Sequence, residues 1–208
     1  MSGKSIVEKK KRRKDNGTTN LVARLMAISA RTAPKTTGID CLDIKILKDE
    51  ETARLGKAMI EYGGKRKSIV PEHKGKNIKY TGDYMEKAFV RDGENVENSE
   101  VVLLIGLRKP ASAMLNCGGC GVDRCIDRRV RKGVEFDGVQ CGFRLLDLGI
   151  ALGSAVKTAS LLNVDNRIFF TAGAVAKRMG FMNCDWVLGI PLSVTGKNIF
   201  VDRPTIGV

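Results

Sequence analysis

The chain has 208 residues, of which 43% are hydrophobic, and this is enough to bury a sizeable core. Its formal net charge is +13, but only 5% of its residues are aromatic, which argues against a nucleic-acid module built on stacking rings. No apolar run approaches the roughly 20 residues that a bilayer span needs, and the first residues are charged where a signal peptide is apolar, so we expect a cytoplasmic protein.

Much of the positive charge lies in a basic N-terminal arm, residues 1–17. Residues 1–14 carry seven Lys or Arg against one acid, Glu8, which leaves a charge of +6. Such a run is typical of a solvated arm, and the alternative is an arm that docks on RNA or on an acidic partner. Residues 18–208 are predicted to form a single α+β domain.

Hydrophobic periodicity predicts a helix and then a strand after the arm. Thr18 or Thr19 can cap a helix that ends before Pro34. Its packed face is predicted from the apolar residues that recur at helical spacing, namely Leu21, Leu25 and Ile28. Residues 41–47 alternate apolar and polar side chains, which indicates a strand with one mostly buried face.

Two further helices and a strand are predicted before the middle of the chain. A helix that begins at Asp49 should stop at Gly63-Gly64, because glycine commonly ends a helix. Another helix is predicted over residues 83–97. Residues 101–107 are an unbroken apolar run of strand length, which is typical of a strand at the centre of a sheet.

Four cysteines with a distinctive spacing follow this strand. Two residues separate the first from the second, four the second from the third and fifteen the third from the fourth: Cys117, Cys120, Cys125 and Cys141. Interspersed glycines let the backbone wrap closely and point its amides inward: Gly118, Gly119 and Gly121. This pattern favours the ligands of one iron–sulfur cluster, with three local thiolates and one remote.

Other interpretations of the cysteines stay open. A zinc site with four cysteines usually shows two paired Cys-x2-Cys knuckles, and only one is present. Disulfides are disfavoured without a signal for an oxidising compartment. Cys41 and Cys184 lie in apolar surroundings and are expected to be buried thiols.

A basic stretch beside the third cysteine could receive an acidic electron carrier, or be a solvated helix face: Arg124, Arg128, Arg129, Arg131 and Lys132.

The last part of the chain again alternates helix and strand. Residues 145–162 have helical periodicity and several small residues, which suits close contact with another helix in the core or in a dimer. A short helix is expected over residues 174–179. Strands are expected over residues 167–171, 185–190 and 198–201. The pattern indicates an α+β or α/β sheet fold.

The Cys-Gly-Gly-Cys-Gly core with a distant fourth cysteine, over residues 110–142, resembles the small cluster-binding module of corrinoid iron–sulfur proteins and of an electron-transport complex subunit. Segments along the rest of the chain resemble a bacterial and archaeal family described as containing a ferredoxin domain: Ala30-Arg-Thr-Ala-Pro-Lys35, Arg91-Asp-Gly-Glu-Asn-Val96 and Gly189-Ile-Pro-Leu-Ser193. The resemblance implies a [4Fe-4S] cluster in an inserted module.

The run from Ala30 to Ile44, and the late small-residue helix before Gly189-Ile-Pro, are similar to flavin-dependent nitroreductases. That resemblance implies an α/β sandwich, a homodimer with FMN at its interface, and flavin or phosphate contacts from Arg31, Thr32 and Lys35. The Asn-x-Gln-Pro-Trp signature expected after them is replaced by Gly38-Ile-Asp-Cys-Leu42.

Three functions follow from these observations. The first is a redox protein in which a [4Fe-4S] cluster exchanges single electrons with a partner. The second is an oxidoreductase in which the cluster serves a flavin or a substrate near Arg31, Lys35 and Asp40. The third is a metal-stapled protein that binds RNA through its arm. Hydrolysis is poorly supported, because His73 is the one histidine and no phosphate loop of the Walker kind is present.

Overall fold

The structure is a computed structural model that describes residues 16–69, 82–109 and 111–201. Residues 1–15 of the basic arm and His73 therefore lie outside the described residues. A four-stranded sheet has the order β1-β2-β4-β3, with β1 at Leu42–Lys48, β2 at Val101–Arg108, β4 at Cys184–Ser193 and β3 at Asp165–Asn166. All three neighbouring pairs are antiparallel.

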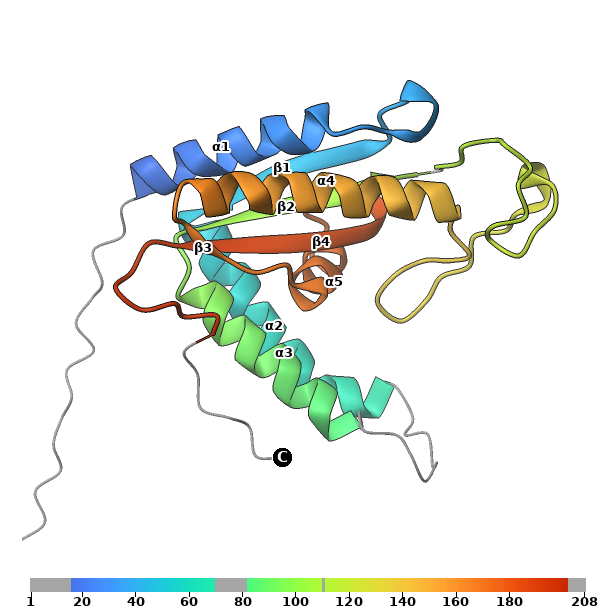
Figure 1. Ribbon diagram of the computed structural model, residues 1–208. Coiled ribbons are helices and arrows are strands. Elements are labelled where there is room, and N and C mark those ends of the chain that lie inside the picture. The colour runs from blue at the N-terminus through green and yellow to red at the C-terminus, as the bar shows by residue number, and fades with distance from the viewer. Residues whose placement is uncertain (1–15, 70–81, 110, 202–208) are drawn as a thin grey trace, which may run out of the picture.

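Helices cover both faces of the sheet. In Figure 1, α1 (Asn16–Thr32) and α4 (Gly142–Leu161) lie side by side on one face, and α2 (Asp49–Ile69), α3 (Gly82–Glu97) and α5 (Phe170–Arg178) lie on the other. Two short 3-10 turns lie at Thr36–Gly38 and Cys125–Asp127. The architecture is the predicted α+β fold, a sheet between two helical layers.

The position of β2 between two other strands explains why its sequence is an unbroken apolar run. It pairs with β1 on one side and β4 on the other, so that Ile105 lies opposite both Ile44 and Leu188. Successive side chains point to opposite faces of a strand. Val101, Leu103, Ile105 and Leu107 therefore enter the core under α1 and α4, whereas Val102 and Leu104 enter the core under the other three helices. The predicted central strand is confirmed.

The prediction that the second helix ends at Gly63-Gly64 is wrong, because α2 continues to Ile69. Gly63 lies in close contact with α3. A Cβ atom on Gly63 would lie 3.0 Å from the carbonyl oxygen of Glu86 and 3.1 Å from Cβ of Phe89. This glycine permits close packing of the two helices rather than a helix end.

The predicted packed face of the first helix is also wrong. Leu21, Leu25 and Ile28 are 52%, 39% and 59% exposed. The residues of α1 that enter the core instead are Val22, Ala23, Met26 and Ala30. The helix carries apolar residues around most of its circumference, and its small residues face the sheet and α4, where close packing requires them.

Two predicted strands are absent from the described residues that should contain them. Residues 167–171 do not form a strand, because α5 already begins at Phe170 and only Phe169 makes an isolated bridge, to Gly189. Residues 198–201 form a turn, in which Phe200 is fully buried. In both places the apolar residues that suggested strands fill the core through other backbone conformations.

Candidate functional site

A long loop connects β2 to α4, and its described residues, 109 and 111–141, project beyond one end of the sheet (Figure 1). It carries Cys117, Cys120 and Cys125, which are exposed or half-buried. Cys141 is the N-cap residue of α4 and is buried. The chain therefore places three of the thiols on the loop and the fourth at its junction with the helix.

Asn116 joins the first and third cysteines of the loop. Its side-chain carbonyl accepts a hydrogen bond from the Cys125 amide at 2.8 Å, and its own amide donates to Cys125 Sγ at 3.3 Å. The hydrogen bond from the Asn116 amide to Sγ is the main cause of the lowered pKa of the Cys125 thiol. The loop between them turns through positive φ angles at Gly118 and Gly121, 68° and 81°, which glycine adopts without steric cost.

Glycines also bring the fourth cysteine's helix against the loop. A Cβ atom on Gly142, the first residue of α4, would lie 3.4 Å from the Gly119 carbonyl oxygen. A Cβ atom on Gly119 would in turn lie 3.5 Å from Cys117 Sγ. The contact between Gly142 and Gly119 thus places the start of α4, beside Cys141, next to the turn that carries Cys117 and Cys120.

The donor chemistry of this region fits an iron–sulfur cluster, although the thiols are not gathered around a common point. Among the described residues, no three His, Cys, Asp or Glu side chains are arranged to hold a metal ion. The four thiols are nonetheless the ligand type that such clusters require. The first turn of α4 contains no acidic residue, and its amides favour negative charge at Cys141.

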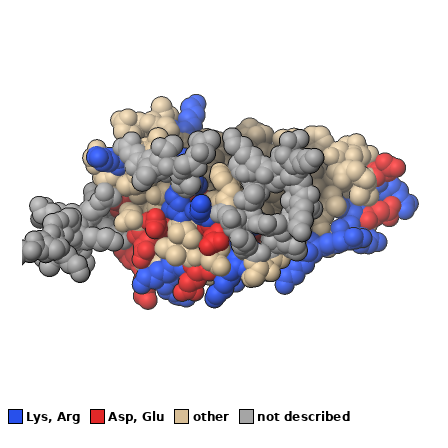
Figure 2. All heavy atoms as spheres, turned by 90° about the horizontal axis from the view of Figure 1, so that it is seen from below, with Lys and Arg blue, Asp and Glu red and all other residues tan. Residues whose placement is uncertain are grey.

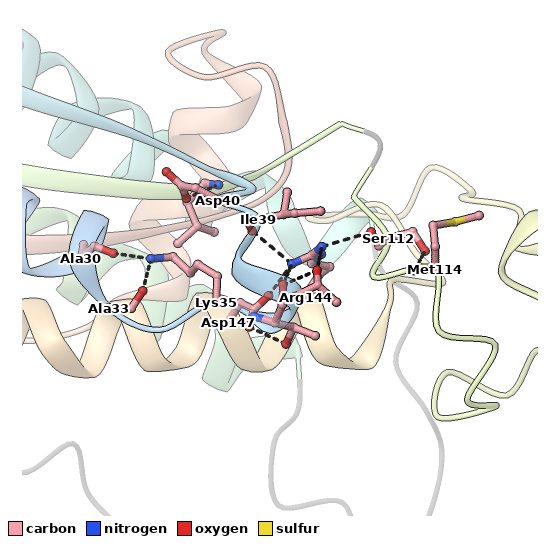
Figure 3. A network of polar contacts seen from close by, with 12 residues as sticks. Ala30, Ala33, Lys35, Ile39, Asp40, Ser112, Met114, Arg144 and Asp147 are labelled. Atoms are coloured by element: carbon pink, nitrogen blue, oxygen red, sulfur yellow. Dashed lines mark hydrogen bonds and ion pairs between the residues drawn. The ribbon is translucent and has the colours of Figure 1, made fainter.

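Sequence reasoning missed a buried ion pair three residues after Cys141. Arg144 and Asp147, on the first turns of α4, lie 2.8 Å apart. Figure 3 shows Arg144 between the loop after α1 and the loop after β2. It donates to the carbonyl oxygens of Thr36, Ile39 and Ser112, at 2.9, 3.2 and 3.3 Å. Arg144 therefore connects the turn at residues 36–39 with the approach to the cysteine loop.

Asp147, the acidic member of the pair, also binds the turn at residues 36–39. Its Oδ1 accepts hydrogen bonds from both the amide and the hydroxyl of Thr36, each at 2.8 Å. The sequence signal for the pair is an arginine and an aspartate three residues apart within a small-residue helix. That spacing places both on one face of a helix, but it does not reveal that they are buried.

The structure places the three predicted flavin residues together at the end of α1, where the chain already uses their polar groups. Lys35 donates to the carbonyl oxygens of Ala30, Arg31 and Ala33 at 2.8, 3.0 and 2.6 Å (Figure 3). Thr32 donates to the carbonyl oxygen of Ile28 at 3.0 Å. Both side chains stabilise the last turn of the helix.

Arg31 differs from its two neighbours, because about half of its side chain is exposed. It pairs with Asp40 and donates to the Leu42 carbonyl oxygen at 2.8 Å. Burial raises the pKa of Asp40, but the hydrogen bond and charge of Arg31 outweigh it, and the pKa lies below its usual value. Arg31 also lines an open groove of about 440 Å³ with Ile28, Ile44 and Ile46.

The basic stretch beside the third cysteine divides into two kinds of residue. Arg124 pairs with Asp127 at 2.6 Å, Arg128 donates to the carbonyl oxygens of Val139 and Ala111, and Arg129 donates to that of Ile126. Within the described chain, Arg131 and Lys132 have no carboxylate partner. Figure 2 shows Lys and Arg side chains gathered along the lower right edge of the molecule in that view.

The remaining two cysteines are buried thiols, as predicted. Burial raises the pKa of Cys41. Burial and the neighbouring carboxylate of Asp43, which accepts from Cys184 Sγ at 3.8 Å, raise the pKa of Cys184 to about 12. Both thiols are therefore held in their neutral form at physiological pH.

Comparison with known proteins gives a family and a fold. The family model described as "Uncharacterized protein containing a ferredoxin domain (DUF2148)" matches residues 137–203, which include Cys141 but not the other three loop cysteines. A protein of Archaeoglobus fulgidus, described as an uncharacterized protein, is 38% identical over 187 residues, which cover 88% of this chain and 90% of the relative.

Solved structures with a similar fold include nitroreductases. The FMN-dependent nitroreductase NfnB from Mycobacterium smegmatis, in complex with NADPH, aligns with 85% of this chain and 78% of its own, at 10% identity and a TM-score of 0.52. A nitroreductase with bound FMN from Desulfitobacterium hafniense aligns with 86% and 79%, at 13% identity and a TM-score of 0.51. The fold is nitroreductase-like. None of the described helices is long and apolar enough to cross a membrane.

Proposed function

This chain belongs to the family of proteins described as containing a ferredoxin domain (DUF2148), and we propose that within it the chain is a redox protein that binds a [4Fe-4S] cluster through Cys117, Cys120, Cys125 and Cys141. When bound, such a cluster supplies reversible one-electron transfer. The proposed module spans residues 110–142.

The observation that carries this proposal is the folding of the cysteine loop. Asn116 ties the segment before Cys117 to Cys125 with two hydrogen bonds, at 2.8 and 3.3 Å. Gly119 packs against Gly142, which brings Cys141 to the same end of the molecule. These contacts support the proposal of three local cysteine ligands and one remote ligand, because they bring the loop and the start of α4 together.

Backbone amides of the module can offset the negative charge of a cluster. The Asn116 amide already donates to Cys125 Sγ. The free amides at the N-terminus of α4 lie beside Cys141, where the helix dipole favours negative charge. Hydrogen bonds to cluster sulfurs raise the reduction potential, so these groups would set the potential of the protein.

An acidic electron carrier is the proposed partner. Arg131 and Lys132 carry charges that no described carboxylate compensates, and Arg129 is exposed. A positive surface next to a redox centre increases the rate of encounter with an acidic protein. Electron exchange with such a carrier should slow as the salt concentration rises.

The test is anaerobic purification, followed by a visible spectrum and by iron, sulfide, zinc and flavin analysis of the same sample. A broad band near about 400 nm with about four iron atoms and four sulfides per chain supports the proposal. One zinc per chain without colour would overturn it and leave a metal-stapled fold.

A flavin-dependent oxidoreductase that uses the cluster as an electron relay is the second candidate. Two observations favour it: the nitroreductase-like fold and the groove that Arg31 lines. Lys35 does not fit as a flavin contact, since its ammonium is bound to three carbonyl oxygens. FMN titration of the wild type and of Arg31→Gln tests this candidate: saturable binding that weakens in the variant supports it, and no binding to either protein overturns it.

A homodimer is proposed from the outer surface of α1 and α4. Exposed apolar residues recur on α4 at Leu146 and Ile150, and Gly149 and Gly153 on the same face have open space around them. Leu21, Leu25 and Ile28 add an exposed apolar face on α1. Small and apolar residues at helical spacing on neighbouring helices suit close packing against a second copy.

A further inference from the structure

A second candidate site lies on the α5 side of the sheet. A cavity of about 740 Å³ opens between residues 130–135 of the long loop, the C-terminal end of α5 and the segment that leads into β4. Lys109, the residue directly after β2, and Asp137 contribute to its wall. Its volume falls within the range of about 300–1,000 Å³ that is typical of small-molecule sites.

Some of the charges in this wall neutralise one another. Asp137 lies 2.9 Å from Lys177 and 3.5 Å from Lys109, and Lys109 also lies 3.6 Å from the buried Asp185. Lys177 and Asp137 are largely buried. Glu135, the other acid of the wall, pairs with Arg66 at 2.7 Å. Every carboxylate of the wall is therefore already matched by a cation.

Three cations of the same wall have no carboxylate partner among the residues that the structure describes. Arg131 and Lys132 make no ion pair within the described chain. Arg178 donates to the Val134 carbonyl oxygen at 2.9 Å, and its guanidinium lies 4.5 Å from the centre of the Tyr62 ring. Neither contact offsets its positive charge. The cavity is thus left with an excess of three positive charges.

We propose that this cavity binds a small polyanion that carries phosphoryl groups, held by Arg131, Lys132 and Arg178. Guanidinium groups present planar, forked donors that match phosphate oxygens, and an ammonium adds a mobile point charge. Two or three negative charges, as in pyrophosphate or a nucleoside diphosphate, would match the excess.

The lining of the cavity favours the phosphoryl part of such a ligand over an aromatic part. The described lining contains no aromatic side chain, so stacking on a ring would not contribute. Its apolar residues are few: Val130, Val134 and Met182. Charge and hydrogen bonding would therefore dominate the affinity, and binding should weaken as salt rises. The proposal goes beyond the redox function and does not require the cluster.

The experiment is calorimetric titration of the full chain, purified anaerobically with the metal it carries, against inorganic pyrophosphate, ADP and citrate. The test variant is Arg131→Gln with Lys132→Gln. The matched control is Arg54→Gln with Lys57→Gln, two exposed residues of α2 whose loss changes the net charge equally. Iron analysis of each sample shows separately whether the proposed cluster is present.

Saturable binding of pyrophosphate and ADP, weakened about tenfold or more in the test variant and unchanged in the control, supports the proposal. Equal weakening in both variants would assign binding to net charge and overturn it. Stronger binding of citrate would overturn the phosphoryl class, and absence of saturable binding of all three would overturn the site.

Discussion

Arg144 and Asp147 form an ion pair at 2.8 Å in which the side chains are only 1% and 2% exposed. The pair lies on the first turns of α4 and holds the turn after α1 through Thr36 and the approach to the cysteine loop through Ser112. Two segments distant in the sequence are thus fixed to the helix that begins next to Cys141.

Replacing Asp147 with alanine should lower the free energy of unfolding by about 3–5 kcal/mol, because it leaves the Arg144 guanidinium buried without a counter-charge. Urea unfolding measures the change. The matched control is Asp127→Ala, which removes an aspartate from the same i,i+3 relation to an arginine, but in an exposed pair with Arg124. In Asp127→Ala the free energy of unfolding should fall by less than about 1 kcal/mol. Equal losses would contradict the role assigned to burial.

Each single substitution of a proposed cluster ligand by serine should remove most of the iron and the visible absorbance. The four variants are Cys117→Ser, Cys120→Ser, Cys125→Ser and Cys141→Ser. Iron and sulfide per chain are measured after anaerobic purification. Alanine at Cys41 or Cys184, both buried and outside the loop, should leave the iron content unchanged. Full iron in any two of the four serine variants would refute the ligand set.

Gly63→Ala should destabilise the protein by about 1–3 kcal/mol, because the added Cβ meets the Glu86 carbonyl oxygen and the Phe89 side chain of α3. The next residue gives the control. A Cβ on Gly64 has nothing within 4 Å, so Gly64→Ala should raise stability by up to about 1 kcal/mol through its higher helix propensity. Urea midpoints of both variants test the difference, and a loss at Gly64 as large as that at Gly63 would speak against the close helix contact.

Stability should fall in alkaline solution because of Cys184. Burial, with the charges of Asp43 and Asp185, raises its pKa from 9.0 to about 12 in the folded protein, against which Lys109 acts only weakly. Above about pH 9 the unfolded chain loses the thiol proton while the folded protein retains it, so the unfolding free energy decreases as the pH rises toward 12. The fall should be smaller in Cys184→Ala. Denaturant midpoints from pH 8 to 11 measure it, and parallel curves for the two proteins would exclude the thiol as a cause.

Glutamate at Ile150, which is 48% exposed on α4, should convert the proposed dimer to a monomer, because a charge would be buried in an apolar interface. Light scattering coupled to gel filtration gives the molar mass. Ile69→Glu provides the matched control, since Ile69 is 43% exposed at the end of α2, on the other face of the sheet, and its replacement should leave the mass unchanged. A monomeric wild type would remove the basis of this prediction.

Much of the fold could be predicted from the sequence where one local pattern dominates. The central strand, β1, α3 and α4 lie close to their predicted ranges, because each shows a strong apolar period or run. The predicted strands at residues 167–171 and 198–201 are wrong because Phe169 and Phe200 are buried in the core without belonging to a regular strand. Gly63 was misread because a glycine at a helix end and a glycine at a close helix contact look the same in the sequence.

The candidate site also has features that can be predicted from the sequence and features that depend on packing. Its residue types can be read from the sequence: four cysteines at a spacing that suits a cluster, glycines that allow the loop to turn, and a basic stretch beside the third cysteine. These are properties of residue type and local spacing, and they do not depend on how the chain packs.

Packing of the folded chain determines which of the polar and charged groups remain available to a ligand or partner. Lys35 donates to carbonyl oxygens at the end of α1, and Arg144 is buried with Asp147. Arg131 and Lys132 lie beside a cavity and have no carboxylate partner among the described residues. Whether a charge is compensated depends on distances of a few ångströms between segments far apart in the chain, and on the water that packing removes. Residue identity supplies the charge, but packing determines its partner.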